Sequence, residues 1–329
     1  MNFKVKKYLT VVLMLSFYST LLFAWGFWAH KRINKMAVFT LPSEMIGFYK
    51  RNIEYIETHA VDPDKRRNIN AEEAPRHYID IDRYGDHPFD SIPEHWNDAV
   101  KKYGEDSLKA HGIVPWHIQV ILQRLTNAFK DKNVELIMHY SADIGHYVAD
   151  AHVPLHVTRN YNGQLTNQVG IHAFWESREP ELFGDNYDYM VGRCHYIEKP
   201  LNETWSIIKA SYAAHDSVLD FERKLNEEFP SDRKYSIEER GGTTVKTYSK
   251  EYSYAYDKML DGQVERRMHS AILEVGSFWY TAWVNAGSPD LEYMEQYKMS
   301  EEEKKKLEAE DKMWKTGKIP AANKGHSDE

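Results

Sequence analysis

Residues 134–156 read VELIMHYSADIGHYVADAHVPLH, and this stretch decides the fold class. Its apolar residues, among them Leu136, Ile144 and Val148, recur at helical spacing, and the polar residues between them keep a period of their own. Pro154 interrupts the pattern, because the residue before a proline is pushed away from helical backbone angles. The stretch therefore predicts a long helix that ends just before Pro154.

Similar apolar patterns predict further helices along the chain. The expected ranges are 33–40, 44–58, 96–103, 115–129, 134–151, 200–214, 217–227 and 263–285. Strand signals are sparse, with few alternating β-branched runs and few hairpin dipeptides. Residues 62–90 are rich in Asp, Pro and Arg and predict an ordered loop, and 84–114 predicts an extended loop. We expect an all-α fold with a single multi-helix domain over 25–290, followed by a charged helix and polar tail over 291–329.

The first 24 residues have the composition of a signal peptide. Lys4, Lys6 and Lys7 form a positive head, residues 8–23 are apolar, and Ala24 is a small residue at the expected cleavage position. The alternative is a retained membrane anchor, because the apolar run is only slightly shorter than a spanning helix. We expect cleavage near Ala24, and hence a secreted or periplasmic protein.

The composition limits the possible partners. The chain has 329 residues with 42% hydrophobic residues, enough for a sizeable core. Its formal net charge is −8, which becomes −11 once the three lysines of the first 24 residues are removed. An acidic surface does not coat nucleic acid broadly, although carboxylates that hold divalent metal make the local field positive. The single cysteine, Cys194, cannot form an internal disulfide.

Histidine and carboxylate residues stand at metal-ligand spacing after the middle of the predicted helix. His146 and Asp150 are four residues apart, so both point from one helix face. His156 follows after Pro154, and His172 and Glu176 repeat the spacing of four. Such residues are the usual ligands of catalytic zinc when cysteine is absent. One pair alone is common on solvated helices, but this set together indicates a metal site.

The same residues resemble a known superfamily. The run 146–156 is similar to the H-x3-D-x5-H signature that zinc-dependent phospholipases C share with single-strand-specific zinc nucleases, and 172–176 resembles their H-x3-E/D element. Upstream, AVD at 60–62, HYID at 77–80 and WGFWAH at 25–30 resemble the A-x-D, H-F-I-D and W-G-x-x-G-H elements. The resemblance implies one helical fold with a cleft that holds three zinc ions.

The resemblance also implies which residues hold each zinc ion (Zn²⁺). One ion would be held by Asp62, His77, His146 and Asp150. A neighbouring ion would be held by the α-amino nitrogen and carbonyl oxygen of Trp25, together with His30 and Asp150. A separate ion would be held by His156, His172 and Glu176. The amine of Trp25 becomes free only after the signal peptide is removed, so cleavage would complete the site. Asp64 stands two residues beyond Asp62 as an alternative ligand.

The expected reaction is hydrolysis of a phosphate ester. Asp62 and Asp150 would act through the ions they hold, and a metal-bound hydroxide would attack phosphorus in line. In the nucleases a basic residue three positions beyond the aspartate contacts the phosphate, and Lys65 stands at that position here. The alternative for this lysine is a solvated charged loop.

The resemblance leaves two substrate classes open. Glu176 and the lack of paired cysteines favour a phospholipase C acting on a phospholipid headgroup. The spacing of Trp25 and His30, together with Asp80, favours a nuclease acting on single-stranded nucleic acid or nucleotides. We expect the phospholipase C-like hydrolase, as a monomer with no stable protein partner. The alternatives are the nuclease and, from a different class, a non-catalytic zinc-binding protein.

Overall fold

The computed structural model describes residues 26–67, 69–240, 243–292, 294, 297, 300–302 and 305. The expected signal peptide, Trp25 and most of the expected C-terminal helix and tail lie outside these residues. Within them the chain is mostly helical, with one small two-stranded sheet, so the mainly helical class is confirmed. In this described part, no helix combines the length and the apolar character that crossing a membrane requires.

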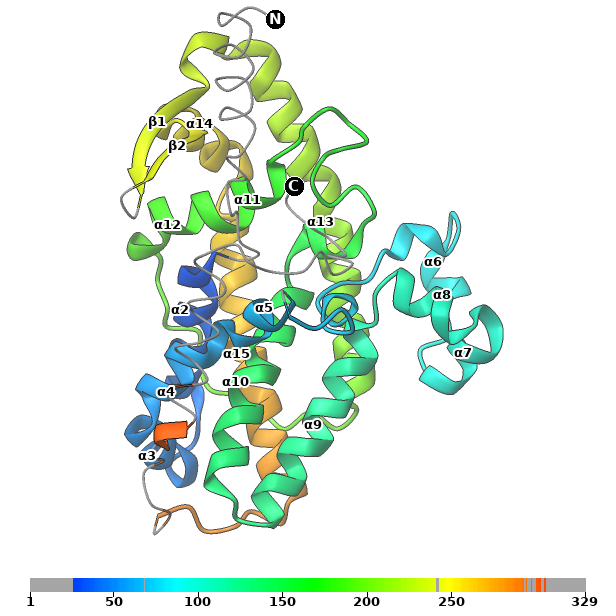
Figure 1. Ribbon diagram of the computed structural model, residues 1–329, viewed down its shortest axis with the longest axis vertical. Coiled ribbons are helices and arrows are strands. Elements are labelled where there is room, and N and C mark those ends of the chain that lie inside the picture. The colour runs from blue at the N-terminus through cyan, green and yellow to red at the C-terminus, as the bar shows by residue number, and fades with distance from the viewer. Residues whose placement is uncertain are drawn as a thin grey trace, which may run out of the picture.

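Helix α10 (Val134–Ala151) lies at the centre of the fold (Figure 1). It packs against α2 (Phe27–Ala37), α9 (Val114–Lys130), α13 (Pro200–Glu228) and α15 (Gln263–Asn285). Almost every residue in its C-terminal half is buried, including the polar ones. Buried polar groups need partners, so polar side chains on this half of the helix indicate a group of interacting residues in the interior.

The remaining elements are short. They are α3 (Ser43–Arg51), α4 (Ile53–Thr58), α5 (Asp62–Arg67), α6 (Pro88–Ser91), α7 (Trp96–Tyr103), α8 (Glu105–Ala110), α11 (Ile171–Ala173), α12 (Glu179–Phe183), α14 (Lys250–Leu260), β1 (Tyr235–Arg240) and β2 (Thr243–Tyr248), with 3-10 turns at His59–Val61, Ala74–Arg76 and Pro154–Val157 and a π-helical turn at Phe174–Arg178. Short elements of this kind connect the long helices and carry most of the residues discussed below.

Several predicted helices are confirmed and others are corrected. Helix α10 has the predicted bounds, and the side chain of Asn133 accepts a hydrogen bond from the backbone N–H of Leu136 at its start. The helix predicted over 44–58 is interrupted at Asn52, and the two helices predicted over 200–227 form the single helix α13. The helix predicted over 96–103 is confirmed as α7, but the rest of 84–114 is not an extended loop, because it also forms α6 and α8, and all three helices project beside α9 in Figure 1.

A close approach of α2 to α10 depends on a glycine. A Cβ atom at Gly145 would lie 2.2 Å from Oδ1 of Asn34, so only glycine leaves room for α2 at this position. The amide of Asn34 donates a hydrogen bond to the carbonyl oxygen of Ala142, 3.1 Å away. The contact brings the ring of His30 on α2 onto the ring of His146 on α10, with 3.9 Å between their centroids.

The β1–β2 hairpin was not expected from the sequence. Its strands are antiparallel, with Tyr235 opposite Tyr248 and Arg240 opposite Thr243. Arg178, in the π-helical turn, donates from both terminal nitrogens to Glu238 of β1, over 2.9 and 2.5 Å. The hairpin is therefore fixed to the turn that carries Glu176.

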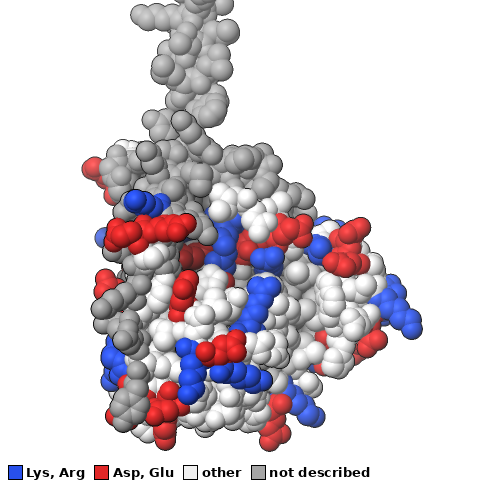
Figure 2. Space-filling view, turned by 60° about the horizontal axis from the view of Figure 1, so that its bottom comes forward, with Lys and Arg blue, Asp and Glu red and all other residues white. Residues whose placement is uncertain are grey.

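The surface carries both signs of charge. On the face shown in Figure 2, Lys and Arg side chains are interspersed with Asp and Glu side chains. Opposite charges mixed in this way produce no strong field of one sign over that face. Any attraction for an anionic substrate there must come from a local group of residues.

Candidate metal centre

Seven of the predicted ligands meet in the interior. They come from α2 (His30), the residue after the Ala74–Arg76 turn (His77), α10 (His146 and Asp150), the Pro154–Val157 turn (His156), α11 (His172) and the π-helical turn (Glu176). Each of these side chains has an exposed fraction of 1% or less. Titratable groups this deep in a protein need close partners of opposite charge or a bound cation.

The first group of ligands surrounds one oxygen of Asp150. Oδ2 of Asp150 lies 2.9 Å from Nδ1 of His77 and 3.1 Å from Nε2 of His146, and these two nitrogens are 3.0 Å apart. Oδ1 of Asp64 lies 3.7 Å from each of the two nitrogens. Four potential ligand atoms from three segments, α5, the residue after the Ala74–Arg76 turn and α10, therefore lie close together.

These separations fit a tetrahedral zinc ion. With metal–ligand bonds of about 2.0 Å, tetrahedral ligand atoms lie roughly 3.3 Å apart, in the middle of the observed range. Nδ1 of His146 donates to the carbonyl oxygen of Ala60, 2.9 Å away, which leaves the Nε2 lone pair free for a metal. Both carboxylate oxygens of Asp64 are buried without a hydrogen-bond partner among the described residues. A cation between these atoms would satisfy them all.

The second group shares Asp150 with the first. Its other oxygen, Oδ1, lies 3.4 Å from Nε2 of His30. His30, Asp64 and His146 also offer ligand atoms that all lie within 4.8 Å of one another. Asp150 thus has one oxygen toward each of two neighbouring positions that can hold a metal ion.

The third group is formed by His156, His172 and Glu176. Oε2 of Glu176 lies 3.1 Å from Nε2 of His172 and 3.4 Å from Nε2 of His156. Nδ1 of His156 donates to the carbonyl oxygen of His77, 2.8 Å away, so its Nε2 is left for a metal. This hydrogen bond also links the third group to the first, since His77 belongs to the first.

The electrostatics of the three groups suit a cation. Burial by itself would raise the pKa of Asp150, but the neighbouring His146 and His156 hold it well below its usual range. Burial likewise would raise the pKa of Glu176, but His172 and His156 lower it to about 2. Burial, together with the nearby His146, lowers the pKa of His30 and favours the neutral ring that ligates metal.

Asp62 does not join the proposed ligands of the first group. Its Oδ2 lies 2.5 Å from Nδ1 of His59, and its Oδ1 lies 3.4 Å from Nζ of Lys65. Asp62 is the first residue of α5, and positions two apart on a helix point about 200° away from each other. Asp64 therefore takes the place in the first group that we had expected for Asp62. Lys65, expected at the phosphate, pairs with Asp62 instead.

A second basic residue lies nearer to the proposed ligands. An Nη1 atom of Arg67 lies 3.7 Å from Oδ1 of Asp64, and its side chain is mostly buried. Arg67 stands three residues beyond Asp64, the spacing at which the resemblance places a phosphate-binding cation. With Asp64 in the place expected for Asp62, the basic residue three positions further on is Arg67 and no longer Lys65.

Glu73 is an outer residue of the centre that the sequence did not reveal. Its side chain is fully buried, and its Oε1 lies 3.7 Å from Nε2 of His77. Tyr147 donates its hydroxyl hydrogen to Oε1, and Arg76 donates to Oε2 over 2.7 Å. At this distance Glu73 makes no hydrogen bond to the ring, but a carboxylate behind a ligating histidine favours the tautomer with its proton on the nearer nitrogen. The only signal in the sequence was a glutamate four residues before His77.

No protein-family model matches the chain, and no curated protein is detectably similar to it.

Proposed function

We propose that the chain is an exported zinc-dependent phosphodiester hydrolase of the phospholipase C-like kind. The observation that carries the proposal is the position of Asp150, whose two oxygens lie toward two separate sets of histidines, with the third group alongside. A zinc-storage site needs no such shared carboxylate between neighbouring positions. Two neighbouring groups of potential ligands and one separate group are consistent with the two close zinc ions and one separate ion that the resemblance implies.

The ligand types favour zinc among the common metals. The groups contain imidazole nitrogens and carboxylate oxygens and no cysteine, the ligand set of catalytic zinc. Zinc bound there would lower the pKa of a bound water toward neutrality and stabilise negative charge on a phosphate. The protein's part is to hold the ligands, exclude excess water and orient the phosphate.

Residues around the groups perform these tasks. The carbonyl oxygens of Ala60 and His77 accept Nδ1–H of His146 and His156, and each bond keeps the opposite nitrogen available to metal. Arg67, beside Asp64, is placed to pair with a phosphate oxygen of the substrate. Arginine suits this task because its planar guanidinium binds two phosphate oxygens at once.

The start of the described chain supports a role for Trp25 as an N-terminal ligand. The backbone N–H of Gly26, the next residue, donates to the carbonyl oxygen of Glu176 over 3.2 Å. A Cβ atom at Gly26 would lie 3.0 Å from Cβ of Ser177, so glycine permits this approach. The chain thus enters α2 against the turn that carries a proposed ligand. Signal cleavage next to Trp25 would free an amine close to the centre.

One experiment tests the reaction. The full chain is expressed with its own leader, the exported protein is purified, and hydrolysis of bis(p-nitrophenyl) phosphate is measured. We expect activity that a chelator removes and added zinc restores, and that is absent in Asp150→Asn. Zinc binding without hydrolysis would instead support the non-catalytic zinc-binding protein.

A second assay decides the substrate class. Phosphatidylcholine vesicles and single-stranded DNA are offered to the same zinc-loaded preparation at equal phosphate concentration. We expect faster release of the phosphorylated headgroup than of nucleotides, because Glu176 stands where the nucleases usually have aspartate. The reverse preference would make the chain a single-strand-specific nuclease.

A further inference from the structure

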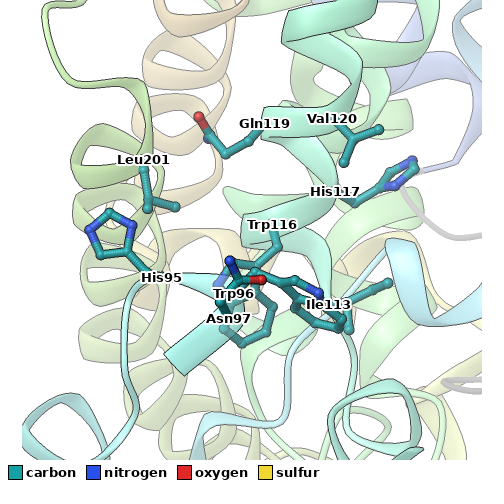
Figure 3. Close-up of a pocket in the computed structure, with 9 residues that line it drawn as sticks. All are labelled: His95, Trp96, Asn97, Ile113, Trp116, His117, Gln119, Val120 and Leu201. Atoms are coloured by element: carbon teal, nitrogen blue, oxygen red, sulfur yellow. The ribbon is translucent and has the colours of Figure 1, made fainter. Parts of the chain in front are cut away.

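A groove of about 430 Å³ lies beside α9 (Figure 3). It is lined by the start of α7, the first turns of α9 and Leu201 at the start of α13. None of its lining residues belongs to the three proposed metal groups. The groove exists because the stretch 84–114 folds back onto α9.

Two indole rings form the base of the groove. The rings of Trp96 and Trp116 meet edge to face, with 5.3 Å between centroids and 64° between planes. The indole N–H groups of Trp116 and Trp205 both donate to the carbonyl oxygen of Glu94, over 2.8 and 3.2 Å. The bond from Trp116 fixes its ring, and Trp96 packs against that ring, so apolar ring surface is in place before anything binds.

The other lining side chains are of two kinds: Ile113, Val120 and Leu201 are apolar, and His95, Asn97, His117 and Gln119 are polar. None of the nine described residues that line the groove is Asp, Glu, Lys or Arg. The ring of His117 points away from Leu201 and Trp96 (Figure 3) and meets the ring of Tyr147 edge to face, with 4.6 Å between centroids. Gln119 donates to Thr204 over 3.1 Å and keeps its carbonyl oxygen for another partner. Asn97 and His95 are exposed at the rim.

This lining selects an uncharged ligand with one apolar face and a polar edge. A charged ligand would lose hydration here without gaining an ion pair, which is unfavourable. A purely apolar chain would leave the remaining carbonyl oxygen of Gln119 without a partner.

We propose that this groove binds a neutral sugar ring, as a site additional to the metal centre. A pyranose has a face of C–H groups that packs on an indole ring, and hydroxyls at its edge that both donate and accept hydrogen bonds. The crossed arrangement of Trp96 and Trp116 leaves no parallel slot in which a flat nucleobase would be held on both faces. The groove is large enough for a single ring of this kind.

Calorimetric titration of the zinc-loaded full chain with maltotriose and with tri-N-acetylchitotriose tests the proposal. We expect saturable binding of at least one of these neutral sugars. Trp96→Ala should weaken it about tenfold, because a stacked aromatic contact is lost. Asn97→Ala, an exposed change that spares the fold, should weaken it by a smaller factor. Tyr254→Ala, which removes an aromatic side chain 53% exposed on α14, is the matched control and should leave binding unchanged.

Three outcomes would overturn the proposal. The first is that neither sugar binds the unaltered chain. The second is that both Trp96→Ala and Asn97→Ala, shown by circular dichroism to be folded, bind sugar as the unaltered chain does. The third is that adenosine binds in a manner that depends on Trp96 and the sugars do not, which would make the groove a nucleobase site.

Discussion

A carboxylate oxygen of Asp64 lies 3.7 Å from Nδ1 of His77, in a group with His146 and Asp150. Two residues earlier, Asp62 faces the other way and binds His59. The sequence pattern A-x-D points to Asp62, but the first turn of α5 gives only one of the two carboxylates access to the histidines. The pair therefore offers a direct test of the proposed metal centre.

Asp64→Asn should weaken zinc binding, whereas Asp62→Asn should not. The amide of asparagine is neutral and a poor zinc ligand, so the first group would lose one of its charged members. Zinc content after dialysis against a competing chelator, measured by mass spectrometry, is the readout. Both variants carry the same chemical change, at positions two residues apart, so each is the control for the other. Equal loss of zinc from both, or loss from Asp62→Asn alone, would contradict the assignment.

Asp150→Asn and Glu176→Gln should differ in how much zinc they lose. Asp150 has an oxygen toward each of two neighbouring groups, so its variant should lose the ions of both groups and keep the third. Glu176 belongs to the third group alone, so Glu176→Gln should lose only that ion. Zinc stoichiometry on folded protein measures the difference. An identical stoichiometry in the two variants would argue against a shared carboxylate.

The periodic parts of the fold could be predicted from the sequence. Helix α10 has the predicted bounds because its apolar residues repeat over several turns and Pro154 follows directly. The stretch 84–114 was mispredicted as an extended loop because α6 and α8 are only four and six residues long, too short for a clear period. The β1–β2 hairpin carried one signal, Gly241-Gly242, but the run before it, YSIEER at 235–240, ends in three charged residues and lacks the composition of a strand.

The candidate site was predicted where its ligands share a local motif. His146 and Asp150, like His172 and Glu176, stand four apart on one helical turn, so their proximity follows from the helix alone. The choice between Asp62 and Asp64 depends on where α5 begins, which the sequence does not specify. Glu73 was missed because its contact with Tyr147 joins residues 74 positions apart and arises only from tertiary packing.

Arg67→Ala should reduce catalysis far more than Lys65→Ala. Arg67 lies beside the proposed ligand Asp64, where it can stabilise charge on the phosphate, and loss of one such donor costs about a hundredfold in kcat/KM. Lys65 pairs with Asp62, and removing an ion pair of this kind changes activity by about threefold or less. Rates with bis(p-nitrophenyl) phosphate are compared at matched zinc content. A larger loss for Lys65→Ala would restore that lysine as the phosphate contact.

His152 should make the protein less stable in acid. Burial, with Arg267 nearby, lowers its pKa from 6.5 to about 3 in the folded chain. As the pH falls below 6.5, His152 binds a proton in the unfolded chain but stays neutral in the folded chain. The free energy of unfolding therefore decreases between about pH 6.5 and 3. His152→Asn should flatten this dependence by up to about 1.4 kcal/mol per pH unit. Urea unfolding with chelator present measures it, and His139→Asn, an exposed histidine, is the control.

Glu73→Gln should weaken zinc binding at the first group without removing a ligand. Glu73 accepts hydrogen bonds from Tyr147 and Arg76 and lies 3.7 Å from Nε2 of His77, where its negative charge favours the tautomer that leaves Nδ1, facing Asp150, free to ligate. Loss of such an outer carboxylate typically costs about 10- to 100-fold in metal affinity. Competition with a fluorescent zinc chelator measures the change, and Glu72→Gln, at a neighbouring side chain 65% exposed, is the control. Because glutamine keeps the shape of glutamate, an unchanged affinity in folded protein would mean that Glu73 supports packing alone.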